Sequence, residues 1–151
     1  MKKLHLSLCL LMIVSLFSCG SDDNDTPETI EISEANLIGT WKLTGFSENG
    51  VPVELDACDL LYTMQLSKTQ NGENIAVYVE GYLDQGECKT STSVDYVWEL
   101  VSGNLNTETA DMGTDQDTEK IIELTATSLK LEYTDIEDTE TIVYVDTYTR
   151  Q

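Results

Sequence analysis

Apolar and polar residues alternate with a period of two through nearly the whole chain after Leu37. This period places successive side chains on opposite faces of a β-strand, so that one face is buried and the other is solvated. No segment after the N-terminal leader has helical periodicity over ten or more residues, and only residues 31–37 are suited to a helical turn. The sequence therefore predicts an all-β domain and excludes α/β folds with their phosphate-binding loops.

Eight strands are predicted, at about 39–47, 60–67, 74–83, 92–101, 104–109, 119–126, 128–134 and 140–149. Their connections alternate in length: short turns, such as Asn71-Gly72 with its type I′ signal, alternate with longer loops. Alternate connections of an up-and-down meander lie at the same end. The pattern therefore predicts an eight-stranded antiparallel barrel with a closed base and an open mouth, although an open sandwich shares the alternation.

The N-terminus has the pattern of an export signal. Lys2 and Lys3 precede an apolar run at 8–17, which is shorter than the roughly 20 residues of a membrane-spanning helix. Residues 16–19 (Leu-Phe-Ser-Cys) resemble a bacterial lipobox, which implies cleavage before Cys19 and lipidation of that cysteine. The acidic stretch that follows resembles the export signal of surface lipoproteins in Bacteroidota-type bacteria.

These features divide the chain into three parts. We expect a lipoprotein signal peptide at 1–18, an acidic flexible tether at 19–34 and a barrel domain at 35–151. The expected location is the outer membrane, at the cell surface, with the membrane contacted through the lipid on Cys19.

The charge balance limits the possible partners and chemistries. The chain has 28 acidic and 8 basic residues, for a formal net charge of -20, which argues against nucleic-acid binding because phosphates require clustered Lys and Arg. Its only histidine, His5, lies in the predicted signal peptide, so removal of that segment would exclude Ser-His-Asp and Cys-His catalysis and His-based zinc sites. We expect no cofactor and no enzymatic activity, with a glycosidase built from two carboxylates as the enzymatic alternative.

Two cysteines remain in the exported domain, Cys58 and Cys88. An even pair in an oxidising compartment predicts a disulfide. The alternatives are two free thiols, or part of a metal site that lacks its other ligands. In the predicted meander Cys58 precedes the second strand and Cys88 precedes the fourth, so both are expected at the mouth.

The first predicted strand opens with Gly39-Thr40-Trp41, and Arg150 follows the last strand. This resembles the Gly-x-Trp signature of lipocalins and other calycins, and the layout of 37–150 is similar to that of the lipocalin-like lipoproteins of Bacteroidota. The resemblance implies that Trp41 packs across the closed base and that Arg150 lies against it as a structural pair. The chain departs from lipocalins in its short length and in lacking a C-terminal helix.

An inward-facing Trp41 and the apolar phase of each strand predict which side chains fill the barrel. The predicted inward set is Gly39, Trp41, Leu43, Leu60, Tyr62, Met64, Leu66, Ile75, Val77, Val79, Val94, Tyr96, Trp98, Leu100, Ile122, Leu124, Leu129, Leu131, Tyr133, Ile142, Tyr144 and Tyr148. A barrel of this size holds either side chains or one small ligand. In the second case Tyr62, Tyr96 and Trp98 are candidate ligand-binding residues, because they offer apolar faces with polar tips.

The predicted mouth loops are strongly acidic. They carry Glu48, Glu54, Asp56, Asp59, Asp84, Glu87, Asp111, Asp115, Asp117, Asp135, Glu137 and Asp138 against one base, Lys89. Such a rim favours neutral or cationic ligands over anions. Asp111, Asp115 and Asp117 form a weak Ca²⁺ candidate, because hard cations take clustered carboxylates. Their spacing differs from that of an EF-hand, which favours the alternative of a solvated acidic loop that maintains solubility.

Two functions follow from this interpretation. The first is a lipid-anchored binding module for a small neutral or cationic ligand. The alternative is a structural lipoprotein with a filled barrel that docks a protein partner in the envelope.

Overall fold

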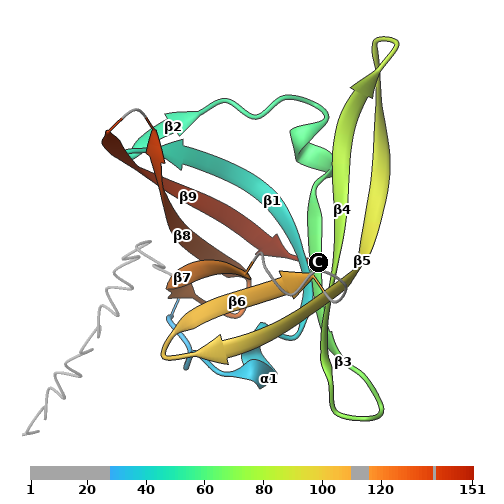
Figure 1. The fold of residues 1–151 in the computed structure, drawn as a ribbon, viewed down its shortest axis with the longest axis vertical. Coiled ribbons are helices and arrows are strands. Elements are labelled where there is room, and N and C mark those ends of the chain that lie inside the picture. Colours follow the sequence, from blue (N-terminus) through green and yellow to red (C-terminus); the bar gives the residue numbers. More distant parts are fainter. Residues whose placement is uncertain (1–27, 110–115, 138) are drawn as a thin grey trace, which may run out of the picture.

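The computed structural model describes residues 28–109, 116–137 and 139–151, and Figure 1 shows their course. Within them nine antiparallel strands form one sheet: β1 (Gly39–Glu48), β2 (Val51–Val53), β3 (Thr63–Lys68), β4 (Asn74–Asp84), β5 (Glu87–Val101), β6 (Asn104–Thr109), β7 (Gln116–Leu124), β8 (Ser128–Glu137) and β9 (Glu140–Arg150). Neighbours follow the order β2-β1-β3-β4-β5-β6-β7-β8-β9, and β1 also pairs with β9. This last pairing closes eight strands into the predicted antiparallel barrel, and β2 is an extra strand folded back on β1.

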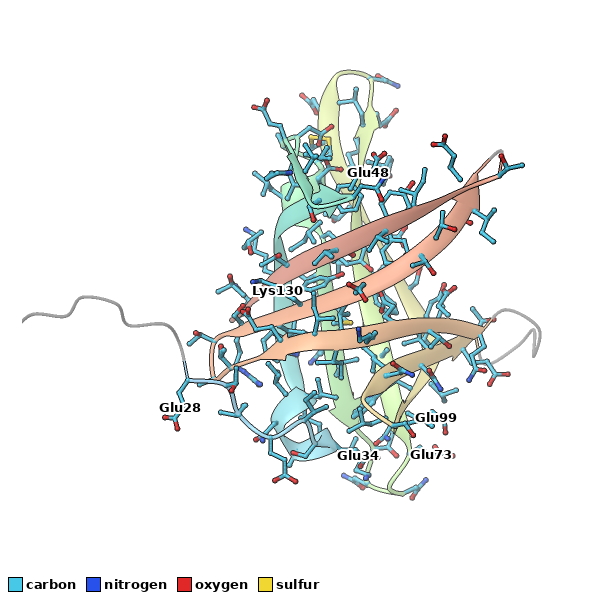
Figure 2. All side chains as sticks on the ribbon, turned by 90° about the vertical axis from the view of Figure 1, so that its left-hand side faces the viewer. Glu28, Glu34, Glu48, Glu73, Glu99 and Lys130 are labelled. Carbon is cyan, nitrogen blue, oxygen red and sulfur yellow. A yellow bond between two sulfur atoms is a disulfide. The ribbon has the colours of Figure 1, made fainter. Side chains whose placement is uncertain are left out.

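The barrel has two unlike ends, which we call the base and the mouth. The helical turn α1 (Glu34–Leu37) and the β3–β4, β5–β6 and β7–β8 turns lie at the base, whereas the β1–β2, β4–β5 and β8–β9 turns lie at the mouth. In Figure 2, Glu34 and Glu73 mark the base near the bottom and Glu48 lies at the mouth above them. No helix in the described ranges is long and apolar enough to cross a bilayer.

Two connections that the sequence predicts as long loops are tight turns instead. β4 and β5 continue to Gln85 and Gly86, and their hairpin projects well beyond the barrel in Figure 1. Both turn residues have positive φ (54° and 87°), which is the geometry of a type I′ turn whose twist matches its strands. β8 and β9 likewise extend to within two residues of each other.

The predicted type I′ turn at Asn71-Gly72 is wrong. Of the two residues only Gly72 has positive φ, and five residues separate β3 from β4. Thr69 organises this wider turn, because its carbonyl accepts from Gly72 N–H at 3.0 Å and its hydroxyl accepts from Glu73 N–H at 3.0 Å. A side-chain acceptor at the turn entrance thus stabilises a longer loop over the two-residue form.

Strand register determines which side chains face inward. Trp41 pairs with Met64 and Met64 pairs with Tyr78, so the three share the inner face. On β4 the inward residues are therefore Ala76 and Tyr78, and the predicted inward set of Ile75, Val77 and Val79 is wrong.

The prediction for β7 is also wrong in part. Ile121 is buried, while the predicted Ile122 is 41% exposed. The β7–β8 register shifts between Ile121 and Glu123, and this bulge brings both Ile121 and Leu124 inward although they are three residues apart.

The base is sealed around Trp41, which is fully buried. Its indole N–H donates to the Leu37 carbonyl of α1 at 2.8 Å, and the Arg150 guanidinium lies 4.1 Å from the ring centroid. Arg150 also donates to the carbonyls of Ile38 (2.8 Å), Ala126 (3.0 Å) and Asn36. The structure thus brings Trp41 and Arg150 together as the resemblance implies.

Gly39 leaves room for this arrangement. Its φ is +150°, and a Cβ built there would meet the Arg150 guanidinium. The glycine of the Gly-x-Trp signature is therefore required by the approach of Arg150.

Contacts with the barrel begin within the segment that the sequence assigns to the tether. Thr29 forms a β-bridge with Thr125, and the Ile30 N–H donates to the Leu124 carbonyl at 2.9 Å. Ile30 also packs against the core, so the chain joins the barrel at its base. The predicted signal peptide, Cys19 and the acidic stretch after it lie outside the described residues.

Cys58 and Cys88 form a disulfide, which confirms the predicted pairing. The bond joins the β2–β3 connection to the projecting β4–β5 hairpin. Asp56 positions Cys58, because its Oδ1 accepts from the Cys58 N–H at 2.6 Å. Gly81 on β4 permits the contact, since a Cβ there would collide with the Cys58 carbonyl.

Candidate ligand-binding cavity

The half of the barrel nearer the mouth is hollow. It contains a half-open cavity of about 630 Å³, whereas the half nearer the base is filled by the core around Trp41, Met64 and Leu129. The cavity is lined by Tyr62, Tyr78, Glu80, Tyr96, Thr107, Gln116, Asp117, Thr118, Glu119, Tyr133, Thr134, Asp135, Asp146 and Tyr148.

Five of these lining residues are tyrosines, and four of them form a connected row. The ring centroids of Tyr62 and Tyr148 are 6.3 Å apart, those of Tyr62 and Tyr78 are 6.1 Å apart, and those of Tyr78 and Tyr96 are 5.1 Å apart. The fifth, Tyr133, stacks on its neighbour in β9 at 5.1 Å. The walls thus offer aromatic faces in the spacing range of favourable ring pairs.

Five carboxylates line the same space, on Glu80, Asp117, Glu119, Asp135 and Asp146. Burial, followed by the negative charges of Asp146 and Asp117, raises the pKa of Glu119 to about 7. Burial also raises the pKa of Asp146, although the Tyr148 hydroxyl donates to its Oδ2 at 3.1 Å and opposes the shift.

The tyrosine hydroxyls are held neutral. Burial is the main cause that raises the pKa values of Tyr62, Tyr78 and Tyr148 above their usual range, and it raises that of Tyr133 to about 12. The negative charge of Glu119 adds to the shift at all four. The cavity therefore combines neutral hydroxyls with carboxylates that repel one another.

The structure places two of the three predicted ligand-binding residues, Tyr62 and Tyr96, in the cavity wall. Trp98 is not in this wall. It lies two residues further along β5, deeper in the core, where it is 3% exposed and its indole N–H donates to the Ser67 carbonyl at 3.2 Å.

The Ca²⁺ candidate is not brought together in the described part of the chain. Asp117 lines the cavity, whereas Asp111 and Asp115 lie outside the described residues. No group of three or more His, Cys, Asp or Glu side chains suited to a metal occurs among the residues that are described.

Sequence reasoning missed Tyr78, Glu119 and Asp146. Tyr78 was missed because Ile75, Val77 and Val79 were predicted to face inward on β4, which placed Tyr78 on the outer face. Asp146 lies between Tyr144 and Tyr148, which were both predicted to face inward, so strand alternation places it in the interior. Glu119 is two residues before Ile121, and only the correct phase of β7 reveals it.

Replacing Glu119 by glutamine is expected to stabilise the fold at alkaline pH. The pKa of Glu119 is raised from 4.5 to about 7 in the folded protein, so the folded state binds the Glu119 proton more tightly than the unfolded state does. The stability that comes from this tighter binding is fully present below about pH 4.5 and is lost as the pH rises through 7. Glu119→Gln should therefore raise the free energy of unfolding at pH 8 by about 1–3 kcal/mol, the lower figure allowing for solvent screening, and should change it little at pH 4. Urea unfolding at both pH values measures the difference.

Glu73→Gln is the matched control, because Glu73 is exposed in the β3–β4 turn at the base (Figure 2). It should leave stability nearly unchanged at either pH. Equal stability of Glu119→Gln and the wild type at pH 8 would contradict a desolvated carboxylate in the cavity.

Among solved structures, a lipocalin-like protein from Bacteroides uniformis ATCC 8492 is similar, with a TM-score of 0.50 and 15% sequence identity over 77% of this chain and 99% of that one. The odorant binding protein OBP1 has a TM-score of 0.48 and 12% identity over 81% of this chain and 76% of that one. A deswapped triple mutant of bovine odorant binding protein has a TM-score of 0.44 and 12% identity over 77% of this chain and 74% of its own. No curated protein matches the chain.

The sequence itself matches a protein family. The family described as "Lipocalin-like domain" matches residues 37–131, which is more than half of the chain and extends from α1 into β8. The matched span includes the Gly39-Thr40-Trp41 motif, and the closed barrel agrees with it. This chain therefore belongs to the family of lipocalin-like domains.

Proposed function

We propose that this protein is a lipid-anchored binding module of the cell envelope that holds one small neutral or cationic molecule in its barrel. The cavity of about 630 Å³ carries the proposal, because small-molecule sites typically span about 300–1,000 Å³. Lipocalin-like folds typically serve as small-ligand-binding modules, which agrees with the hollow half of this barrel. The same cavity argues against the alternative in which side chains fill the interior.

The anchored location rests on the sequence of the N-terminus. The charged start, the short apolar run and the Ser18-Cys19 junction occur together in the order of a lipoprotein signal. The acidic stretch after Cys19 supports display at the cell surface.

Native mass spectrometry of the protein purified from its own membrane tests the binding role. We expect a complex heavier than the processed chain by the mass of one small molecule. Thr107→Trp should reduce the ligand-bound fraction severalfold, because Thr107 lines the cavity and an indole there fills part of it. Thr90→Trp, on the exposed β4–β5 hairpin, is the matched control and should keep the ligand. A wild-type protein that carries nothing, or a ligand retained equally by Thr107→Trp, would contradict the role.

Cys19→Ala is expected to move the protein from the membrane fraction to the soluble fraction, because it removes the thiol that carries the lipid. Fractionation followed by immunoblotting measures the shift. Cys9→Ala makes the same substitution inside the apolar run and should leave the protein in the membrane. Retention of the Cys19→Ala variant in the membrane would rule out the lipid anchor without affecting the proposed cavity ligand.

A further inference from the structure

We infer that the cavity selects an organic ammonium ion, a molecule with a protonated amine on an aromatic body. The inference rests on the proposed function, since it names the class of ligand for the same cavity. Two independent features support the inference. The cavity has aromatic walls that are suited to an apolar body, and every charged side chain that lines it is acidic.

No basic side chain compensates the five cavity carboxylates. Of the eight basic residues, Lys2 and Lys3 lie in the predicted signal peptide, and none of the other six lines the cavity. Four form ion pairs elsewhere: Lys68 with Glu34, Lys89 with Asp84, Lys120 with Glu132 and Lys130 with Glu123. Arg150 is held at the base, and Lys42 follows the inward Trp41 on the opposite face of β1. Residues 110–115, between β6 and β7, contain no basic residue either.

Glu119 is central to the charged lining. The ionisable groups that interact with it come from several walls: Asp117 on its own strand, Asp146 and Tyr148 on β9, Tyr133 on β8, Tyr78 on β4, and Tyr62 just before β3. All of them are neutral or negative. A cation beside Glu119 would therefore meet attraction from several directions.

The aromatic walls complete the site for such a cation. Tyr62, Tyr78 and Tyr96 form a continuous row with centroids 5–6 Å apart, and a ring face attracts an ammonium group within about 6 Å. An aromatic body can pack against the same rings while its amine reaches the carboxylates. A neutral ligand would fill the space but leave the partly buried carboxylates of Glu119 and Asp146 without a cationic partner, and an anion would add to the repulsion among the cavity carboxylates.

Calorimetric titration with three probes that share one ring system tests the inference. The probes are 2-(1-naphthyl)ethylamine, 2-(1-naphthyl)ethanol and 1-naphthylacetate, which are a cation, a neutral molecule and an anion at about pH 8. We expect the amine to bind at least about tenfold more tightly than the alcohol and the acetate to bind weakest, as paired charges in a partly desolvated site require.

Glu119→Gln should weaken amine binding about tenfold and leave alcohol binding unchanged, because it removes one charge and keeps the shape of the side chain. Glu73→Gln makes the same change at the far end of the barrel and should leave both affinities unchanged. Lowering the pH from 8 to about 5.5 should weaken wild-type amine binding more than that of Glu119→Gln, since the pKa of Glu119 is about 7.

The outcomes separate this inference from the proposed function. Equal affinities for the amine and the alcohol, unchanged by Glu119→Gln, would overturn the ammonium selectivity and leave a small-molecule binding role standing. Preference for the alcohol or the acetate would overturn it in the same way. Absence of binding by all three probes would overturn the inference, and the proposed function would fail with it only if the protein from its native membrane also carried no ligand.

Discussion

Trp41→Ala is expected to lower the free energy of unfolding by about 3–5 kcal/mol, the range for truncating a large aromatic side chain in a packed core. Trp41 is fully buried, and its indole N–H bonds to the Leu37 carbonyl, so the substitution both opens a cavity and leaves a buried acceptor without its donor. Chemical denaturation at neutral pH measures the loss. A loss below about 1 kcal/mol would contradict a packed base.

A double-mutant cycle with Arg150→Ala isolates the contact between the two residues. Arg150 lies 4.1 Å from the indole centroid and also donates to three backbone carbonyls. Only the cation–π part should couple to Trp41, so we expect a coupling energy of about 0.5–2 kcal/mol, with the rest of the Arg150 effect persisting in the Trp41→Ala background. Lys42→Ala, on the outer face of β1, should show no coupling. Strictly additive losses for Trp41 and Arg150 would mean that the contact contributes nothing to stability.

Loss of the Cys58–Cys88 bond is expected to cost about 3–4 kcal/mol, because it releases a loop that the bond closes across 30 residues of sequence separation. The double variant Cys58→Ser/Cys88→Ser should melt at a lower temperature than the wild type. Reductant should lower the melting temperature of the wild type and leave that of the variant unchanged.

Mass spectrometry of the intact protein provides a second readout. The oxidised protein should weigh two daltons less than the reduced form, and its two thiols should resist alkylation until reductant is added. Thiols that react in the folded, unreduced protein would contradict the bond.

The barrel could be predicted from the sequence because its determinants are short sequence patterns. Strand alternation, the Gly39-Thr40-Trp41 motif and Arg150 were sufficient to predict the eight strands that close the barrel, its closed base and the contact between Trp41 and Arg150, whereas the extra strand β2 was not predicted. The predicted disulfide needed only two cysteines and an oxidising compartment.

The cavity was harder to predict because it depends on strand phase. β4 has apolar residues on both faces, so its phase is decided by pairing with Met64 and Leu66 on β3 and cannot be read from β4 alone. On β7 either of the adjacent residues Ile121 and Ile122 could face inward by its hydrophobicity, and the bulge places Ile121 in the core. Glu119 then faces the interior against the rule that charged residues face water, and such exceptions are expected where a protein binds something.

The entry of the chain at the base has a consequence for orientation. Thr29 and Ile30 join the barrel beside Thr125 and Leu124, at the end opposite the mouth. Thr29 follows Cys19 by ten positions, a span of at most about 35 Å when fully extended. A lipid on Cys19 would therefore keep the sealed end of the barrel within about 35 Å of the bilayer, which favours an orientation with the open end facing away from it. The cavity would then exchange its contents with the surrounding aqueous medium, and a water-soluble amine could reach it without passing through the membrane.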